Sequence, residues 1–242
     1  MKIRHTILGG LLLSCLIPAL PAQAAPVQVD MRDVFNADVI VNGTSGNIDS
    51  TQSPVDNVSY SLATKGALVD CDPPVVEPTW QGLPNNGQFA GNGDHPFVQL
   101  AYRNSKFGKN AVRLEADQKV SFPVPRDKYR KIHLFAMSGD GPSSVKVTFK
   151  YRDDSTTVRN FTIGDWFQSP ATGTYSLIEG IDRMTPDGTT CDESSNEFAD
   201  ADVFGKALRP NKDKNLRRMT IERVLSVDSS ILNTFGVTGL KA

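Results

Sequence analysis

The segment from Tyr129 to Trp166 constrains the fold more than any other part of the chain. It reads YRKIHLFAMSGDGPSSVKVTFKYRDDSTTVRNFTIGDW. Residues 131–136 are apolar apart from Lys131 and His133, which predicts a central strand buried on both faces. Residues 145–151 alternate apolar side chains with lysine or threonine, which predicts a strand with one buried and one exposed face. Residues 156–163 are rich in β-branched side chains and predict a third strand.

Two tight turns join these strands. The first, SGDGPSS, contains Gly139 and Gly141, which tolerate positive φ, and Pro142, which fixes φ before the next strand. Asp140 is explained by the same turn chemistry. Residues 152–155 form the second turn. Because every residue of the segment has a role in packing or in a turn, we interpret it as scaffold.

Strand-like runs continue along the chain with turn signals at short spacing, which predicts an all-β protein, a β-sandwich. We expect one domain over residues 25–242, with long irregular loops at 42–57, 70–96 and 185–205. Few segments have helical periodicity, and residues 197–205 could hold a short helix. Further strands are expected at residues 27–31, 39–41, 59–67, 97–102, 111–115, 119–124, 175–181, 216–224 and 231–239.

Residues 1–24 have the pattern of a secretory signal peptide. Lys2 and Arg4 form the basic region, residues 7–20 the apolar region, and Ala22-Gln23-Ala24 an A-x-A cleavage site. We therefore expect a mature chain that begins at about Ala25 and is secreted or periplasmic. The alternative is a lipoprotein anchored through Cys15. The apolar stretch is too short to span a bilayer, and no later stretch is a candidate span.

Removal of the signal leaves two cysteines, Cys71 and Cys191. In an oxidising compartment the simplest prediction is a disulfide between them, with two unpaired thiols as the alternative. A bridge closing a loop of about 120 residues contributes roughly 4–5 kcal/mol on the chain-entropy account.

The charge of the chain excludes some partners. Its 26 basic and 27 acidic residues give a net charge of −1, and loss of Lys2 and Arg4 makes it −3. A mildly negative protein without a basic cluster is not expected to bind nucleic acid or an anionic membrane surface.

The order of these elements resembles the galactose-binding-like β-sandwich domains of secreted bacterial proteins, which are also appended to glycoside hydrolases. The resemblance implies a jelly-roll fold and sugar binding, and it implies no established catalytic set. The chain departs from the family pattern near residues 44–60, where TSGNIDSTQSPVDN replaces Gly- and Tyr-rich sequence. The resemblance rests on VD at 29–30, FNADV at 35–39, QGLPNNG at 81–87, NAVRL at 110–114, YRKIHLFA at 129–136, GDW at 164–166 and LNTFGVT at 232–238.

The loop at residues 70–96 supplies the ligand-binding candidates, because binding residues concentrate in long loops. Trp80 could stack on a sugar ring, or it could anchor the loop to the core. Asn85, Asn86 and His95 are the other candidates in this loop. Trp166 ends a strand and is expected in the core.

The acidic segment after Cys191 is a candidate cation site. Its carboxylates could bind Ca²⁺, although their spacing matches no EF-hand loop. A solvated acidic loop is the alternative, and in that case the protein has no cofactor. The candidate residues are Asp192, Glu193, Glu197, Asp200 and Asp202.

Catalytic motifs are absent from the sequence: it contains no G-x-S-x-G elbow, P-loop, dinucleotide fingerprint or H-E-x-x-H zinc motif. His133 is expected to be a satisfied strand residue, and His95 could act as a base together with Asp94. We therefore expect a non-catalytic protein that binds a carbohydrate or another cell-envelope component. A protein-interaction or structural module of the envelope, with a protein partner, is the first alternative. The second is a polysaccharide hydrolase or lyase, whose paired carboxylates need only meet in space.

Overall fold

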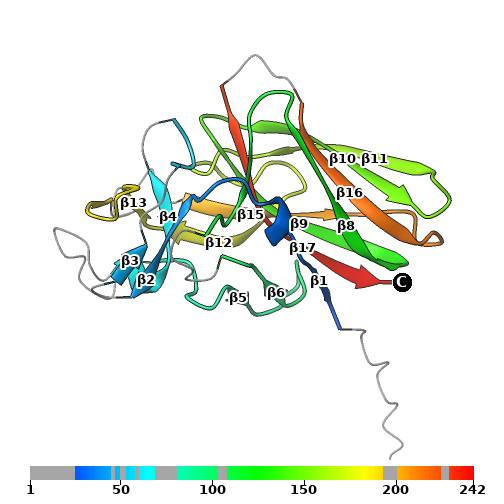
Figure 1. Ribbon diagram of the computed structural model, residues 1–242, viewed down its shortest axis with the longest axis horizontal. Helices are drawn as coiled ribbons and strands as arrows, with labels where there is room; N and C mark the ends of the chain where they lie inside the picture. Colours follow the sequence, from blue (N-terminus) through cyan, green and yellow to red (C-terminus); the bar gives the residue numbers. More distant parts are fainter. Residues whose placement is uncertain are drawn as a thin grey trace, which may run out of the picture.

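The computed structural model of the chain describes residues 25–44, 47–49, 53–57, 60–68, 81–102, 108–192, 201–224 and 229–242. These residues form several antiparallel sheets, and two of the sheets face each other as a sandwich (Figure 1). The all-β prediction is therefore confirmed. No helix within these ranges is long and apolar enough to cross a membrane.

The first sheet has six strands. Its order is β1 (Val27–Val29), β17 (Ile231–Lys241), β9 (Tyr129–Gly139), β15 (Ala201–Leu208) and β12 (Tyr175–Ile181), and β7 (Val112–Leu114) also pairs with β17. The second sheet has four strands, in the order β11 (Thr156–Ile163), β10 (Ser143–Tyr151), β16 (Leu216–Arg223) and β8 (Lys119–Asp127).

Short strands and helices make up the rest of the described fold. A third sheet has the order β14 (Cys191–Asp192), β13 (Arg183–Met184), β4 (Ser61–Ala63), β2 (Ile40–Thr44) and β3 (Asn47–Asp49). Strands β5 (Gln88–Phe89) and β6 (Val98–Gln99) form a separate pair. The short helices are η1 (Arg32–Val34) and α1 (Lys65–Leu68).

The six-stranded sheet is buried on both faces, and this arrangement explains the composition of β9. Ile132, Leu134 and Ala136 face the four-stranded sheet and contact the buried face of β10. Phe135 and Met137 point to the other side, into a second core shared with β2, β4 and the residues around β5 and β6. The prediction of a central strand buried on both faces is confirmed.

The chain changes sheets between β9 and β10. Strand β9 pairs with β15 and β17, whereas β10 pairs with β11 and β16. In the connecting turn Asp140 has φ 58° and Gly141 has φ 111°. The carboxylate of Asp165 accepts a hydrogen bond from the backbone N–H of Gly141 at 2.5 Å. Gly139, by contrast, is the last residue of β9 and has no positive φ.

The predicted helix at residues 197–205 is wrong where the structure describes it. Residues 201–208 form β15, which lies between β9 and β12. The apolar residues Val203 and Phe204 point to opposite faces and enter the two different cores. Burial between two strands therefore overrides the weak local helix preference. The expected loop at residues 42–57 also contains a strand, β3, which pairs with β2.

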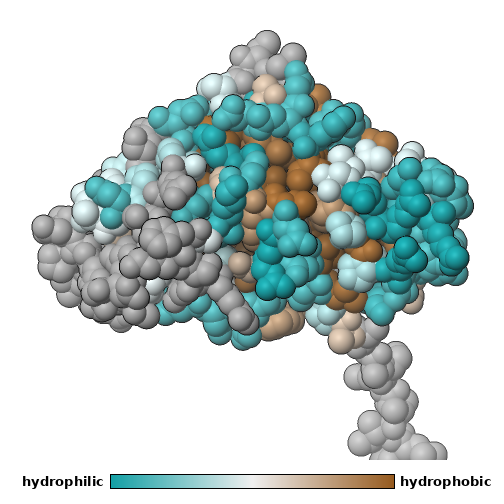
Figure 2. Space-filling view, viewed as in Figure 1, coloured by the Kyte–Doolittle hydropathy of each residue, from teal (hydrophilic) through white to brown (hydrophobic). Residues whose placement is uncertain are grey.

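Figure 2 shows the same view coloured by hydropathy, with hydrophilic residues over much of the surface and hydrophobic residues gathered near the middle of this face. Two large hydrophobic side chains are exposed among the described residues: Phe97, at 42%, and Val158, at 44%. Val158 lies on β11, and Phe97 lies beside the pocket described next.

Candidate functional site

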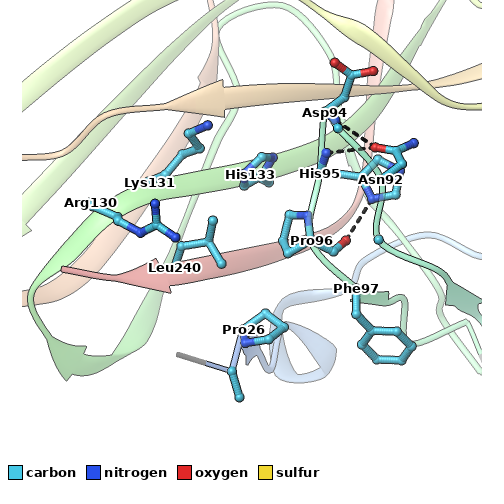
Figure 3. Close-up of a pocket in the computed structure, with 13 residues that line it drawn as sticks. Pro26, Asn92, Asp94, His95, Pro96, Phe97, Arg130, Lys131, His133 and Leu240 are labelled. Carbon is cyan, nitrogen blue, oxygen red and sulfur yellow. Dashed lines mark hydrogen bonds between the residues drawn. The ribbon is translucent and has the colours of Figure 1, made fainter. Parts of the chain in front are cut away.

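A pocket of about 460 Å³ lies between the loop at residues 91–97 and the start of β9 (Figure 3). Arg130, Lys131 and His133 come from β9 on one side of it, and His95 comes from the loop on the other. Leu240 of β17 also lines the cavity. The pocket therefore joins residues that are far apart in the sequence.

A β-bulge allows Arg130 and Lys131 to line the same cavity, although adjacent strand residues normally point to opposite faces. Leu240 pairs with Lys131, whereas the next residue, Lys241, pairs with Tyr129. Arg130 is therefore the extra residue of a bulge at the end of β9, and bulges redirect side chains in this way.

The face of β9 that lines the pocket changes from polar to apolar along the strand. Lys131 and His133 share this face with Phe135 and Met137 because side chains two residues apart lie on the same side. Phe135 and Met137 are covered by the second core. Lys131 and His133 lie beyond it and are covered by the loop at residues 91–97. The pocket thus forms where the cover of the sheet changes from a packed core to a loop.

Asn92 shapes this loop. Its side-chain Oδ1 accepts hydrogen bonds from the backbone N–H groups of Asp94, at 2.8 Å, and His95, at 3.0 Å. The backbone N–H of Asn92 donates to the carbonyl oxygen of His95 at 2.9 Å. This closed turn directs the His95 side chain inward, where it is 4% exposed.

His95 is held by its neighbour in the chain. Its Nδ1 lies 2.8 Å from the carbonyl oxygen of Pro96. A carbonyl oxygen can only accept, so Nδ1 donates this hydrogen bond. The ring stacks on Tyr175, with centroids 5.8 Å apart and planes 16° apart, and meets Phe135 edge-on. Because Nδ1 is bound to the carbonyl oxygen of Pro96, Asp94 does not orient the ring through this nitrogen. A role of His95 as a base together with Asp94 stays a prediction.

His133 is almost fully buried, at 1% exposure. Its Nδ1 lies 2.7 Å from the hydroxyl of Tyr175, and its Nε2 has no hydrogen-bond partner among the described residues. The prediction of a satisfied histidine is therefore correct for one nitrogen only. Burial lowers the pKa of His133 to about 4, with smaller contributions from the charges of Lys131 and His95. The ring is neutral at pH 7.

The charged residues at the pocket give it a positive character. Arg130 and Lys131 make no ion pair with any residue that the structure describes. Asp94 is the one carboxylate among the lining residues, and in Figure 3 its oxygens point away from Arg130. A ligand with a negative or strongly polar group would therefore meet an uncompensated positive charge.

The sequence-based binding candidates have different outcomes. His95 lines the pocket. Asn85 accepts a hydrogen bond from the backbone N–H of Gly66 at 2.7 Å, and Asn86 accepts one from the backbone N–H of Gln88 at 3.0 Å. Asn85 therefore ties its loop to α1, and Asn86 holds a local turn. Trp80 lies outside the described residues, so its proposed role stays a prediction.

The structure describes the side chain of one of the five acidic candidates, Asp202, so the cation site stays a prediction. Glu193, Glu197 and Asp200 lie outside the described residues, and so does the side chain of Asp192. Asp202 is 7% exposed and accepts hydrogen bonds from the Ser176 hydroxyl and the Gly180 backbone. The solvated-loop alternative is therefore wrong for Asp202, which ties β12 to β15. No group of three or more metal-ligating side chains occurs among the residues described.

Two other predictions concern a core tryptophan and a disulfide. Trp166 is 1% exposed and packs in the second core, as expected. Cys191 is the one cysteine within the described ranges, and it is disulfide-bonded. Cys71 lies outside them, so the pairing of Cys71 with Cys191 stays a prediction.

Sequence reasoning missed Arg130 and Lys131 as site residues because they belong to a strand that was interpreted as scaffold. The available signal was the pair of cations at the start of an otherwise apolar strand.

A scan of protein-family models and a search of curated proteins both returned no match to this sequence.

Proposed function

We propose that this chain is a secreted or periplasmic, non-catalytic protein that binds a carbohydrate of the cell envelope in the pocket of His95 and His133. The observation that carries the proposal is the mixed lining of this pocket. Asn92, Arg130 and Lys131 offer polar groups for hydroxyls, and the exposed ring of Phe97 offers an apolar surface at the rim. Saccharides are bound by this combination, because their rings have polar edges and apolar faces.

The small number of carboxylates that line the pocket favours binding over hydrolysis. Glycoside hydrolysis ordinarily uses two carboxyl groups that flank the scissile bond. Asp94 is the one carboxylate among the residues that line this pocket. We therefore favour a binding protein over a hydrolase or lyase.

The resemblance to galactose-binding-like domains supports the proposal at the level of the fold. On this proposal the sandwich is a jelly roll, and the loops at one end of it carry the ligand. Because one fold hosts many functions, the resemblance adds weight only together with the pocket.

A glycan array tests the proposal. We expect the mature protein to bind a defined set of glycans and the Phe97→Ala variant to bind them about three- to tenfold more weakly, as for the loss of one aromatic contact. Val158→Ala is the matched control, because Val158 is equally exposed on the other sheet. Trp80→Ala tests the contribution of the preceding loop separately.

The proposal fails if the wild-type protein binds no glycan, or if Phe97→Ala and Val158→Ala give the same profile as wild type. Co-purification of a stoichiometric protein partner in place of glycan binding would favour the interaction-module alternative.

A further inference from the structure

The predicted start of the mature chain, Ala25, is among the residues that line the pocket. Pro26, Arg130 and Lys131 line the same cavity (Figure 3). Ala25 is also the residue that follows the Ala22-Gln23-Ala24 cleavage site. A predicted processing site and an observed cavity therefore meet at one residue.

Strand β1 holds the start of the chain in this position. The side-chain Nε2 of Gln28 donates a hydrogen bond to the carbonyl oxygen of Phe97 at 3.0 Å. Its Oε1 accepts hydrogen bonds from the hydroxyl of Thr238, at 2.6 Å, and from the backbone N–H of Gln99, at 3.2 Å. One side chain thus ties β1 to the loop at the pocket rim, to β17 and to β6.

Cleavage after Ala24 converts a neutral peptide nitrogen into an α-ammonium group. Such a group has a pKa of about 8 and is positively charged at pH 7. At Ala25 it would join Arg130 and Lys131 around the same cavity, and these two side chains have no carboxylate partner among the described residues.

We infer that signal-peptide removal completes an anion-binding site, in which the new α-ammonium group of Ala25, Arg130 and Lys131 together bind the carboxylate of an acidic saccharide. This inference rests on the proposed function and specifies its ligand class. Three cations around one cavity repel one another, and a bound anion removes that cost. The planar guanidinium of Arg130 can bind a carboxylate through two parallel hydrogen bonds, whereas the two ammonium groups act as point charges.

The test compares D-glucuronate with its methyl ester, which keeps the sugar and removes the charge. Titration calorimetry uses the chain that begins at Ala25 and the same chain with its N-terminus acetylated. We expect glucuronate to bind at least about tenfold more tightly than the ester, and acetylation to weaken glucuronate binding about threefold.

Two matched double variants test the side chains. Arg130→Ala/Lys131→Ala should weaken glucuronate binding at least about tenfold. Lys119→Ala/Arg152→Ala removes the same charge from exposed positions on β8 and in the turn between β10 and β11, and it should leave glucuronate binding unchanged. Circular dichroism spectra of all variants show whether the fold is retained.

The pH profile separates a bound α-ammonium group from a merely structural N-terminus. The affinity of the free-amine chain for glucuronate should fall about threefold between pH 7 and 9, with a midpoint near 8, and that of the acetylated chain should not. The other charged or titratable groups that line the cavity are Asp94, His95, Arg130, Lys131 and His133, and the acetylated chain retains all of them.

The inference is overturned if glucuronate does not bind, if its ester binds equally well, or if acetylation changes neither the affinity nor the pH profile. It is also overturned if mass spectrometry of the secreted protein shows an N-terminus other than Ala25. Binding of neutral glycans on the array, with loss in Phe97→Ala, would leave the proposed function intact in each case.

Discussion

The hydroxyl of Tyr175 lies 2.7 Å from Nδ1 of His133, although a whole strand, β15, separates β12 from β9. Gly205 of β15 pairs with Tyr175 and makes this contact sterically feasible. A methyl group on Gly205 would overlap the ring atoms and hydroxyl of Tyr175. The tyrosine ring therefore lies across β15 at the one position without a side chain, and it connects the outer strand to the pocket.

We predict that Gly205→Ala displaces Tyr175 and destabilises the protein by about 1–3 kcal/mol, the usual cost of overpacking a core. Urea unfolding measures the change. Gly164→Ala is the control, because a methyl group there would meet its neighbours at 3.4–3.5 Å, an ordinary contact distance. Equal stability of the two variants would contradict the proposed role of Gly205.

The acid stability of the protein should depend on His133. Its pKa is about 4 in the folded chain against 6.5 for a free side chain, so the unfolded state binds a proton first as the pH falls. The free energy of unfolding should therefore drop between pH 6.5 and 4, by on the order of 3 kcal/mol from this residue. His133→Gln should flatten this part of the profile.

Other groups act at lower pH. Hydrogen bonds to Arg32 and to Lys214 lower the pKa values of Asp30 and Asp153 to about 2. The contributions of these two carboxylates to the free energy of unfolding are present above pH 4 and are lost between about pH 4 and 2. If the free energy of unfolding of His133→Gln falls as steeply between pH 6.5 and 4 as that of the wild type, His133 does not control stability in that pH range.

Asn110 should be essential for the layer that covers the six-stranded sheet. Its Oδ1 accepts a hydrogen bond from the backbone N–H of Val39 at 2.8 Å, and its Nδ2 donates to the carbonyl oxygen of Ile40 at 3.0 Å and to the carboxylate of Asp38. We expect Asn110→Ala to cost about 2–4 kcal/mol because it leaves several buried groups unsatisfied. Asn86→Ala, in an exposed turn, should cost less than about 1 kcal/mol. Thermal unfolding of both variants measures the two changes.

The partner of Cys191 can be identified directly. We predict that non-reducing peptide mapping yields a Cys71–Cys191 cross-linked peptide. The double variant Cys71→Ser/Cys191→Ser should lose about 2–4 kcal/mol of stability. Alkylation of Cys71 in the unreduced protein would contradict this pairing.

Much of the β architecture could be predicted from local patterns. The alternation in residues 145–151 matches β10, in which every second side chain is buried. Residues 175–181 form β12 with the predicted bounds. These predictions succeed because side-chain alternation reports which face of a strand is buried, and it does so within a few consecutive residues.

The pocket could be predicted only in small part. His95 was a candidate because it lies in a loop, but its stacking on Tyr175 depends on a strand 80 residues away in the sequence. Arg130 reaches the cavity through a bulge, and the bulge exists only in the pairing of β9 with β17. The helix expected at residues 197–205 was wrong because β15 is set by its two neighbouring strands.

By itself, then, the sequence determined the β-class of the protein, the buried central strand β9, the turn at Asp140 and the A-x-A motif before Ala25. Each of these depends on a few adjacent residues. Only the tertiary structure decided that β9 and β10 enter different sheets, that Gly205 makes room for Tyr175, and that Ala25, Arg130 and His95 surround one cavity. These relationships arise from strand order and register, which depend on packing between segments far apart in the chain.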